Sequence, residues 1–435
     1  MQKSSSFKPQ RATQGELIIL FFVGVILVDF TKAFAAVNNV LVNTKSLWQI
    51  VAFEHLDIPW QFEYPVLYQF VSQLSNEDID NIDANHQRLI ELLLPKLNQD
   101  LGNNAFDKTL FDARPDFVSR IEKKQITTDI GRVASGIKGR KWEQITQFSR
   151  AVLVESEAPN SYLEWCAGKG HLGRLIGKLS KSEVVSLEWQ QQLCELGEIQ
   201  AKKHNINQVF VNGDAFECDS RLFKPPQHAL ALHACGDLHV ELLKQGSKAD
   251  TQQLTISPCC YHLIRDEQYQ ALSQPAKSSE LILSKFDLRL PLQHSLIAND
   301  KHNQLRNKEV HWRLSFDALQ RDIFGSQQYL PLPTVKQSQL SDTFEHFCNW
   351  AFDVKNIIHD ERVGFEKYLT IGAQRHRISK QIDLVRHVFR YVLEMWLAYD
   401  RALFLEEHGY KVSINTFCDM SVTPRNLIID AKKYE

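Results

Sequence analysis

From residue 160 onward, short apolar runs alternate with longer segments whose apolar residues recur every three or four positions. Short apolar runs bounded by turn residues are typical of strands, and the longer spacing is typical of helices. This alternation predicts a doubly wound parallel sheet covered by helices. We expect its strands at residues 161–166, 183–189, 208–214, 228–234 and 254–260.

The last part of the sequence predicts a different kind of pairing. A helical pattern over 379–409 stops at Gly409, a residue that is common at helix C-termini. Two strand-like runs follow at 410–417 and 425–433. The short connection between them can join only antiparallel neighbours. We therefore predict an α/β fold with a Rossmann-like sheet, a terminal antiparallel hairpin and an N-terminal helical domain.

The changes of pattern divide the chain into five predicted parts. An apolar run at 17–28 is shorter than the roughly 20 residues that span a bilayer. We interpret it as a buried or partner-facing helix or an over-extended start, and a cleaved signal or anchor is the alternative. The parts are 1–45, an atypical apolar leader; 46–135, a helical domain; 136–264, the first part of the sheet core; 265–378, an insertion for substrate recognition; and 379–435, the closing helix and hairpin.

The composition indicates a folded protein of a reducing compartment. Of 435 residues, 43% are apolar and 23% are charged, which excludes disordered and collagen-like chains. The 50 Lys and Arg nearly balance the 52 Asp and Glu, so only a local basic surface would attract a nucleic acid. Eight cysteines are too dilute for a disulfide scaffold, and the adjacent Cys259 and Cys260 favour the cytoplasm.

The carboxyl ends of the predicted strands, where open α/β sheets bind ligands, carry residues suited to a nucleoside. Gly168 and Gly170 follow the first strand and let the backbone approach a ligand. Glu188 ends the second strand, where an acidic side chain accepts hydrogen bonds from a ribose. Asp214 ends the third strand, where an adenine amino group would lie. Because the loop lacks the third glycine of the dinucleotide fingerprint, we predict adenosine without a pyrophosphate.

Six strings carry a family resemblance: EWCAGKGHLG, VVSLEW, NGDAF, HACGDL, PCCYH and TPRNL. They resemble class I S-adenosylmethionine-dependent methyltransferases. Within these, they resemble the branch with the eukaryotic acceptor-stem tRNA 2′-O-methyltransferase and the methyltransferase-like proteins with a glutathione S-transferase C-terminal domain. The resemblance covers roughly 138–262 and 380–433, and it implies S-adenosylmethionine as cofactor. The cofactor-binding residues that follow are Glu164, Cys166, Gly168, Gly170, Glu188, Asp214 and His233.

The fourth and fifth strands bring a second group of side chains to the same edge. The group is His233, Cys235, Asp237, Cys259, Cys260 and His262. We predict that it lines the methyl-acceptor pocket, where Asp237 or His262 takes or orients a proton. A Cys259 nucleophile and a zinc site are the alternatives, because thiolates and imidazole suit tetrahedral zinc. We assign Asp237, His262 and Cys259 as catalytic and expect no metal.

Basic residues gather at 375–390 and favour a phosphate-contacting face, with a solvated helix end as the alternative. We therefore predict a cytoplasmic methyltransferase without membrane association. Its substrate is RNA of a tRNA-like kind, and protein is the second choice. The rival functions are a non-catalytic glutathione-transferase-like or scaffold protein with a degenerate pocket, and an exported or membrane-tethered protein.

Overall fold

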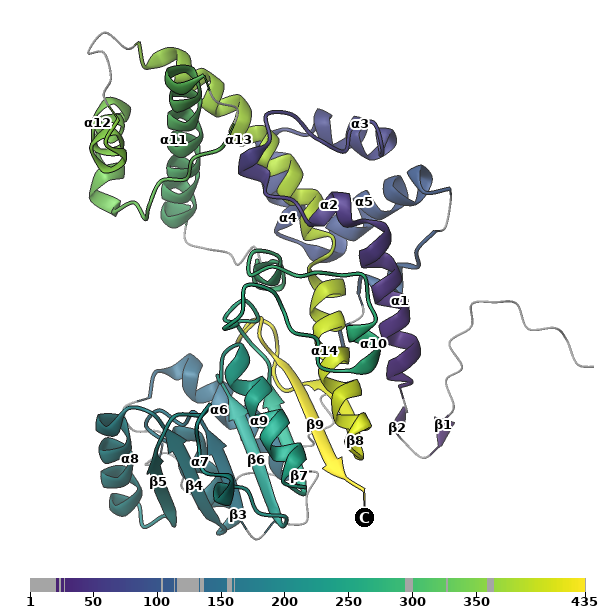
Figure 1. Cartoon of the computed structure of the whole chain (residues 1–435), viewed down its shortest axis with the longest axis vertical. Helices are drawn as coiled ribbons and strands as arrows, with labels where there is room; N and C mark the ends of the chain where they lie inside the picture. The colour runs from purple at the N-terminus through teal and green to yellow at the C-terminus, as the bar shows by residue number, and fades with distance from the viewer. Residues whose placement is uncertain are drawn as a thin grey trace, which may run out of the picture.

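A seven-stranded sheet forms the base of the molecule in this computed structural model (Figure 1). Its strands run in the order β5-β4-β3-β6-β7-β9-β8. They are β3 (Ser161–Trp165), β4 (Glu183–Glu188), β5 (Gln208–Asn212), β6 (Gln227–Leu232), β7 (Gln253–Ser257), β8 (Tyr410–Thr416) and β9 (Leu427–Lys433). The structure describes residues 21–22, 25–26, 28–102, 105–112, 114–115, 133, 137–154, 159, 161–293, 300–325, 328–357 and 364–434.

The strand pairing confirms the predicted fold class. β3 pairs in parallel with β4 and β6, so the strand order reverses at β3, which is the position where open α/β sheets bind their ligands. β9 pairs antiparallel with both β7 and β8, which confirms the terminal hairpin. Every residue of β3 and β7 is buried, as expected for strands covered on both faces.

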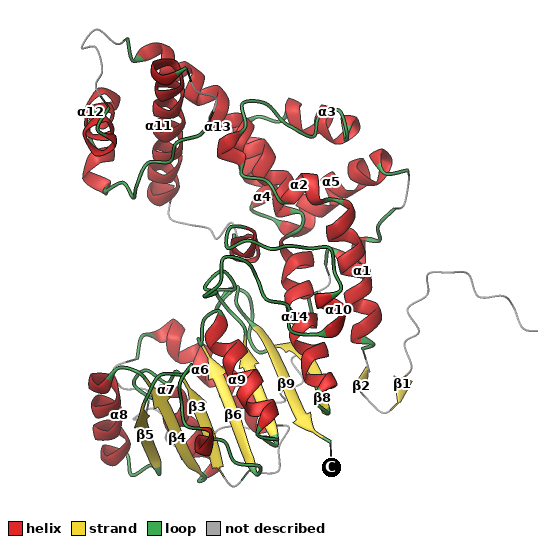
Figure 2. Cartoon of the chain, viewed as in Figure 1, coloured by secondary structure: helices red, strands yellow, loops and turns green. Residues whose placement is uncertain are grey.

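Helices cover both faces of the sheet (Figure 2). On one face, Tyr162 is buried with the apolar side chains of α6 (Gly139–Val154) and α7 (His171–Ser180). On the other face, Leu163 is buried in a core shared with α9 (Asp237–Lys248) and α14 (Arg390–Glu407). The two neighbours face opposite layers because side chains alternate along a strand. In addition, α8 (Gln191–Lys203) packs against β5 at the sheet edge.

The N-terminal helices pack against α13 (Glu366–His387) and α14 (Figure 1). The first of them, α1 (Phe30–Asn43), begins after Asp29, which caps the Lys32 N–H, and Phe34 packs on Trp396 of α14. Part of the predicted leader therefore belongs to the main core, while the domain boundaries stay predictions. The other elements here are α2 (Lys45–Trp48), α3 (Pro65–Gln73), α4 (Asn76–Asp83), α5 (His86–Asp100), η1 (Ala52–Glu54) and η2 (Lys108–Leu110).

The helix expected over the apolar run 17–28 is not found in its described residues. There, β1 (Phe21–Phe22) and β2 (Val25–Ile26) form a short antiparallel pair, in keeping with the preference of β-branched and aromatic residues for extended backbone. Apart from Val28, the remainder of the run lies outside the described residues. Among the helices that the structure describes, none combines the length and the apolar character that a membrane crossing requires.

The insertion adds a separate helical layer. α11 (Asp300–Phe324) packs on α13, and α12 (Phe344–Lys355) closes an apolar cluster around Trp312 and Phe347. The single helix predicted over 379–409 is two helices, α13 and α14, separated at the consecutive buried side chains Val388 and Phe389. The break lets each helix bury its own face. The remaining elements are α10 (Gln274–Lys277), η3 (Ser220–Leu222), η4 (Asp287–Leu292) and η5 (Gln337–Leu340).

Candidate active site

The loop after β3 borders open space. Gly168 and Gly170 have φ angles of 58° and 60°, in the left-handed region that favours glycine. A Cβ on Gly168 would meet no heavy atom within 4 Å, whereas a Cβ on Gly170 would lie 2.4 Å from the Phe210 ring. Gly168 therefore leaves room for a ligand. Gly170 allows the loop to pack closely on Phe210 of β5.

Glu188 fixes this loop from the end of β4. Its carboxylate accepts hydrogen bonds from the N–H of Gly168 at 2.8 Å and from the N–H of Gln190 at 2.9 Å. An ionised carboxylate accepts about four hydrogen bonds, so each oxygen retains a lone pair. Glu188 therefore keeps acceptor capacity next to the loop of Gly168, and its contact with a ribose stays a prediction.

Glu164 lies beneath the loop rather than in the open space. Its buried carboxylate accepts from Ser186 Oγ at 2.7 Å and Gln208 Nε2 at 3.3 Å. A Cβ on Gly173 would lie 2.4 Å from Glu164 Oε2, so α7 closes over the carboxylate. Burial raises the pKa of Glu164 to about 7. The structure places Glu164 as a support of the loop, which differs from the predicted contact with the methionine end.

Ser186 and Gln208 are two residues of this region that the sequence reasoning missed. Gln208 Nε2 also donates to Ser186 Oγ at 2.8 Å and to the Gly170 carbonyl at 3.1 Å, so the pair connects β4 and β5 to the glycine loop. Ser186 carried a signal, because it is a polar residue between the apolar residues Val185 and Leu187, whereas Gln208 stands at the start of its strand, where a polar residue is common. Buried polar groups of this kind are usually paired with one another.

The carboxylates of Asp214 and Glu188 both lie near enough to Cys166 to raise the pKa of its thiol. Burial, and then the charges of Glu188 and Asp214, raise the pKa of Cys166 to about 12. Cys166 therefore stays a neutral thiol between the two strand ends that carry the predicted ribose and adenine carboxylates. The Asp214 carboxylate also accepts from the Phe216 N–H at 2.9 Å, which fixes its side chain. The structure thus brings the predicted nucleoside-binding groups to one place.

A cluster of three cysteines joins the ends of β6 and β7. The Sγ atoms of Cys235, Cys259 and Cys260 all lie within 4.8 Å of one another, and those of Cys235 and Cys259 are 3.5 Å apart. Hydrogen bonds from the other two thiols lower the pKa of Cys260, and the same interactions raise the pKa of Cys259. Of these thiols, Cys260 is therefore the one that loses its proton most readily.

Backbone contacts lock the two cysteine-bearing loops together. The Gly236 N–H donates to the Cys259 carbonyl at 3.0 Å, and the Asp237 N–H donates to the Leu263 carbonyl at 3.1 Å. A Cβ on Gly236 would lie 2.0 Å from the Leu263 carbonyl oxygen, so this approach requires glycine. The approach explains the glycine of the HACGDL string.

Arg401 and His239, which the sequence reasoning missed, support these loops from α14. Arg401 Nε donates to His239 Nε2 at 2.9 Å, and His239 Nδ1 donates to the Ala234 carbonyl at 2.9 Å. The Arg401 guanidinium also lies over the Tyr261 ring, 5.1 Å from its centroid. One buried arginine thus contacts both His239 of α9 and Tyr261 in the loop after β7.

The predicted catalytic residues Asp237 and His262 lie in different surroundings. The Asp237 carboxylate accepts from the Arg265 N–H at 2.7 Å and borders a cavity of about 330 Å³ with Phe216. His262 has a buried Nδ1 without a hydrogen-bond partner, close to Cys260. Asp237 is therefore engaged by the backbone, and of the three predicted catalytic residues only Cys259 belongs to the cysteine cluster.

His233 occupies the exposed side of this group. Its φ angle of 72° is uncommon for a residue with a side chain and turns the chain away from β6. Burial of the imidazole, and then the charges of Lys141 and Arg425, lower the pKa of His233. The imidazole is therefore neutral at physiological pH and lies near two exposed cations.

The basic segment 375–390 makes its contacts inside the fold. Arg375 pairs with Asp317 and donates to the Phe53 carbonyl, and it is 3% exposed. The remaining contacts are Arg377 with the carbonyls of Ser72 and Leu74, Lys380 with Asp80, Arg386 with Asp383 and the Trp48 carbonyl, and His387 and Arg390 with Asp83. This segment does not form the exposed basic face that was predicted, because α3 and α4 pack on it.

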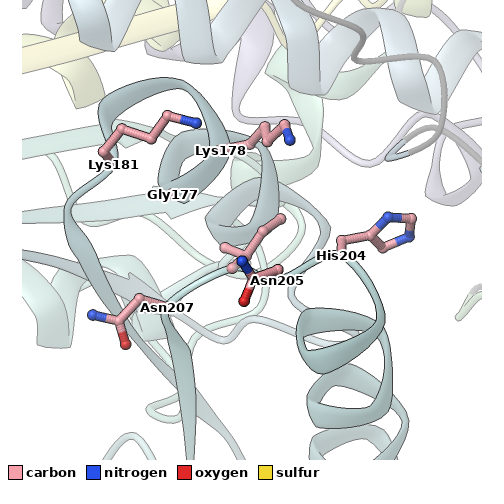
Figure 3. A pocket seen from close by; sticks show the side chains of 7 residues that line it. Gly177, Lys178, Lys181, His204, Asn205 and Asn207 are labelled. Atoms are coloured by element: carbon pink, nitrogen blue, oxygen red, sulfur yellow. The ribbon is translucent and has the colours of Figure 1, made fainter.

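A second cavity lies at the opposite edge of the sheet. It has a volume of about 260 Å³ and is lined by Lys178, Lys181 and His204, among others (Figure 3). Lys178 is in the last turn of α7, Lys181 follows that helix, and His204 lies between α8 and the start of β5. The cavity is therefore remote from the carboxyl ends that carry the candidate site.

A model of a methyltransferase domain matches residues 140–267, which contain the glycine loop, Glu188, Asp214 and the three cysteines. A search of curated proteins finds no match. Because the match covers the site itself, it supports the sequence-based assignment, whereas the narrower branch stays a prediction.

Solved methyltransferase structures resemble the chain only distantly. The N-terminal domain of EvdMO1 with SAH bound is 14% identical, with 30% of this chain and 52% of that chain covered and a TM-score of 0.24. A TehB-like SAM-dependent methyltransferase from Corynebacterium glutamicum is 14% identical, with coverage of 27% and 68% and a TM-score of 0.22. An rRNA methylase from Streptococcus thermophilus is 15% identical, with coverage of 28% and 71% and a TM-score of 0.22.

This chain spans about half the length of the first of these structures. Because the TM-scores are this low, the similarity to a methyltransferase depends on the domain match and on the geometry of the loop after β3. The open space at Gly168 and the converging carboxylates fit an adenosine-bearing cofactor. Residues 140–267 are therefore similar to a methyltransferase domain, in the part of the chain that carries the candidate site.

Proposed function

We propose that this protein is an S-adenosylmethionine-dependent methyltransferase that modifies RNA. The observation that carries the methyltransferase activity is the convergence of Glu188 and Asp214 beside the open space at Gly168. A scaffold protein with a degenerate pocket would have no need to keep that space open. The match of a methyltransferase domain to residues 140–267 supports the same conclusion.

The residues at the strand ends divide the work of methyl transfer. S-adenosylmethionine, when bound, supplies an electrophilic methyl carbon on its sulfonium. Glu188 would accept hydrogen bonds from the ribose hydroxyls, and Asp214 would accept one from the adenine amino group. His233 would take the proton that the acceptor hydroxyl loses when its oxygen receives the methyl group. Direct displacement needs mainly positioning, so no covalent intermediate is required.

Exposed cations near His233 support an anionic substrate. Lys141 and Arg425 are close enough to lower the pKa of His233, and Lys141 and Lys169 act in the same way on His171. All three cations are exposed, and no ion pair is found for them in the described part of the chain. Phosphates bound here would hold an RNA hydroxyl at His233, so these residues replace segment 375–390 as the candidate RNA contact.

Two measurements test this proposal. Isothermal titration with S-adenosylmethionine and S-adenosylhomocysteine is expected to show one site for each, and absence of binding by both overturns the enzymatic assignment. Incubation with a labelled methyl donor and fractionated cellular RNA and protein is expected to label RNA. Label that appears in protein alone overturns RNA as the substrate and leaves the methyltransferase activity standing.

A further inference from the structure

We propose that Cys235, Cys259, Cys260 and His262 bind one zinc ion at the joined ends of β6 and β7. This assignment differs from the absence of metal expected from the sequence. The zinc site would lie at the same edge of the sheet as the methyl-transfer site, but the proposal depends only on the positions of the cysteine and histidine side chains. The ion would lie at the base of the acceptor site.

The spacing of the three sulfur atoms matches zinc coordination. Tetrahedral zinc with Zn–S bonds of about 2.3 Å requires S···S distances of about 3.8 Å. Cys235 Sγ and Cys259 Sγ are 3.5 Å apart, and all three sulfur atoms lie within 4.8 Å of one another. A disulfide would require about 2.05 Å, so the sulfur atoms are separate thiols at ligand spacing. Shifts of less than 1 Å bring the three to a single ion.

A second observation points to the fourth ligand. His262 Nδ1 is buried and has no hydrogen-bond partner in the described structure. A buried ring nitrogen without a partner is costly, and coordination to a metal removes the cost. His262 lies two residues after Cys260, but its ring nitrogens are outside the group of three sulfur atoms that lie within 4.8 Å of one another, so the imidazole has to move toward them to complete the site. Three thiolates and one imidazole form a donor set common in structural zinc sites.

The backbone around the cluster is already fixed for such a site. The bonds from Gly236 N–H to the Cys259 carbonyl and from Asp237 N–H to the Leu263 carbonyl hold the two loops in register. His239 and Arg401 support the same loops from behind. Rigid surroundings of this kind orient metal ligands before the ion arrives.

The donor atoms select the metal. Thiolates and imidazole favour zinc, whereas calcium and magnesium prefer oxygen ligands. Binding converts the remaining cysteine thiols to thiolates and releases their protons to solvent, and no oxidation takes place. A zinc ion here would connect two strand ends that otherwise meet through backbone contacts, and it would place Cys259 and His262 outside proton transfer or nucleophilic attack.

The experiment uses the full-length protein purified under reducing conditions, without cofactor or RNA. Zinc is measured by mass spectrometry, and the metal-free protein is titrated with Co²⁺. We expect one zinc per chain and a cobalt spectrum with thiolate charge-transfer bands and strong tetrahedral d–d bands. Protein that retains all three free thiols yet binds neither metal overturns the proposal. Because neither readout involves methyl transfer, failure of this proposal and failure of the proposed function are distinguishable.

Variants identify the ligands. Cys235→Ser, Cys259→Ser and Cys260→Ser should each lower zinc affinity at least about 100-fold, since even second-shell changes cost about 10- to 100-fold. The matched control is Cys218→Ser, whose thiol donates to Gln245 outside the cluster and whose loss should leave metal binding unchanged. Circular dichroism establishes that each variant is folded.

The fourth ligand has its own test. His262→Ala should weaken zinc binding and shift the cobalt d–d bands, because water replaces the imidazole. A wild-type affinity and spectrum in His262→Ala overturn the assignment of His262. Metal binding that persists in a folded variant lacking two of the three cysteines overturns the site as a whole.

Discussion

The carboxylate of Glu188, at the end of β4, accepts a hydrogen bond from the backbone N–H of Gly168, in the loop after β3. The same carboxylate accepts from the Gln190 N–H, so both of its oxygens are held by N–H donors. Two fixed donors orient the side chain, and each oxygen keeps a lone pair for a further hydrogen bond. The loop after β3 and Glu188, the residue predicted to bind the ribose, are therefore held together as one structural unit.

We predict that Glu188→Gln weakens S-adenosylmethionine binding by roughly 10- to 150-fold, corresponding to about 1.5–3 kcal/mol for a charge-assisted hydrogen bond. The glutamine amide has one acceptor oxygen, whereas the carboxylate has two. Its NH₂ group would therefore face the backbone N–H of either Gly168 or Gln190, which is itself a donor. Isothermal titration measures the loss. Glu183→Gln, at the other end of β4, is the matched control. Equal affinities in the two variants would contradict the role of Glu188.

The two loop glycines should respond differently to alanine. In Gly168→Ala the new methyl group meets no neighbouring atom, but the φ of 58° strains any side chain, so we expect a small loss of stability together with greatly reduced cofactor binding. In Gly170→Ala the methyl group meets Phe210 and Gln208 at 2.4 Å, so we expect a loss of stability. Urea unfolding and isothermal titration separate the two effects. A Gly168→Ala variant that binds cofactor normally would show that the ligand lies elsewhere.

Glu164 should make stability fall as pH rises. Burial raises the pKa of Glu164 from its ordinary value of 4.5 to about 7, so between these values the unfolded chain releases a proton that the folded chain retains. The free energy of unfolding therefore decreases through this window, by about 3 kcal/mol for the full shift. Glu164→Gln removes this slope, which urea unfolding at several pH values measures.

Buried histidines provide the internal comparison for this pH dependence. Burial lowers the pKa of His228 to about 3, so its contribution has the opposite sign and stability rises with pH between about 3 and 6.5. The wild type and Glu164→Gln share this contribution, which cancels in their difference. If the difference between the two proteins does not change with pH, Glu164 is ionised in the folded state and the prediction fails.

Exposed cations near His233 should determine how RNA binding depends on salt. Each phosphate contact adds about 0.7–0.9 to the slope of log affinity against log salt concentration. The double variant Lys141→Ala/Arg425→Ala should therefore lower the slope by about 1.5. Lys411→Ala is the matched control, since Lys411 is exposed on β8 at the opposite edge of the sheet. An unchanged slope in the double variant argues against this surface.

Arg375 should matter for stability and not for RNA. Its guanidinium is buried between Asp317 and the Phe53 carbonyl, and Asp317 also pairs with Arg321. Arg375→Met leaves Asp317 with one partner, and we expect a loss of about 3 kcal/mol, as for a broken buried pair. Thermal unfolding measures the loss, and filter binding over a range of salt concentrations should show an unchanged slope. A reduced slope would return segment 375–390 to the RNA-binding surface.

The sheet was predictable because its signals are local. The periods of two and of three to four residues, and the short turn between β8 and β9, specify strands, helices and an antiparallel pair without tertiary information. The position of Glu164 was not predictable in the same way. A carboxylate at a strand end has the same sequence pattern whether it faces a ligand or a buried serine and glutamine. Only the packing of α7 determines which of the two environments it has.

The arginines of segment 375–390 show a second limit. A run of basic residues has the same sequence pattern whether it meets solvent or carboxylates from distant segments, such as Asp83 and Asp317. The contact of Arg401 with His239 is likewise invisible in sequence, because 162 positions separate the two residues. Long-range pairing of buried charges therefore accounts for most of what the sequence left open.

The position of β9 bears on how this protein can be dissected. β9 pairs with β7, although more than a hundred residues of helical chain intervene, and α14 covers the same region. A fragment confined to 140–267 would thus lack two strands and a backing helix, and β7 would become an unprotected edge ready to pair with other chains. Expression of that fragment alone should give aggregates, so a minimal catalytic unit has to retain residues from both halves of the polypeptide.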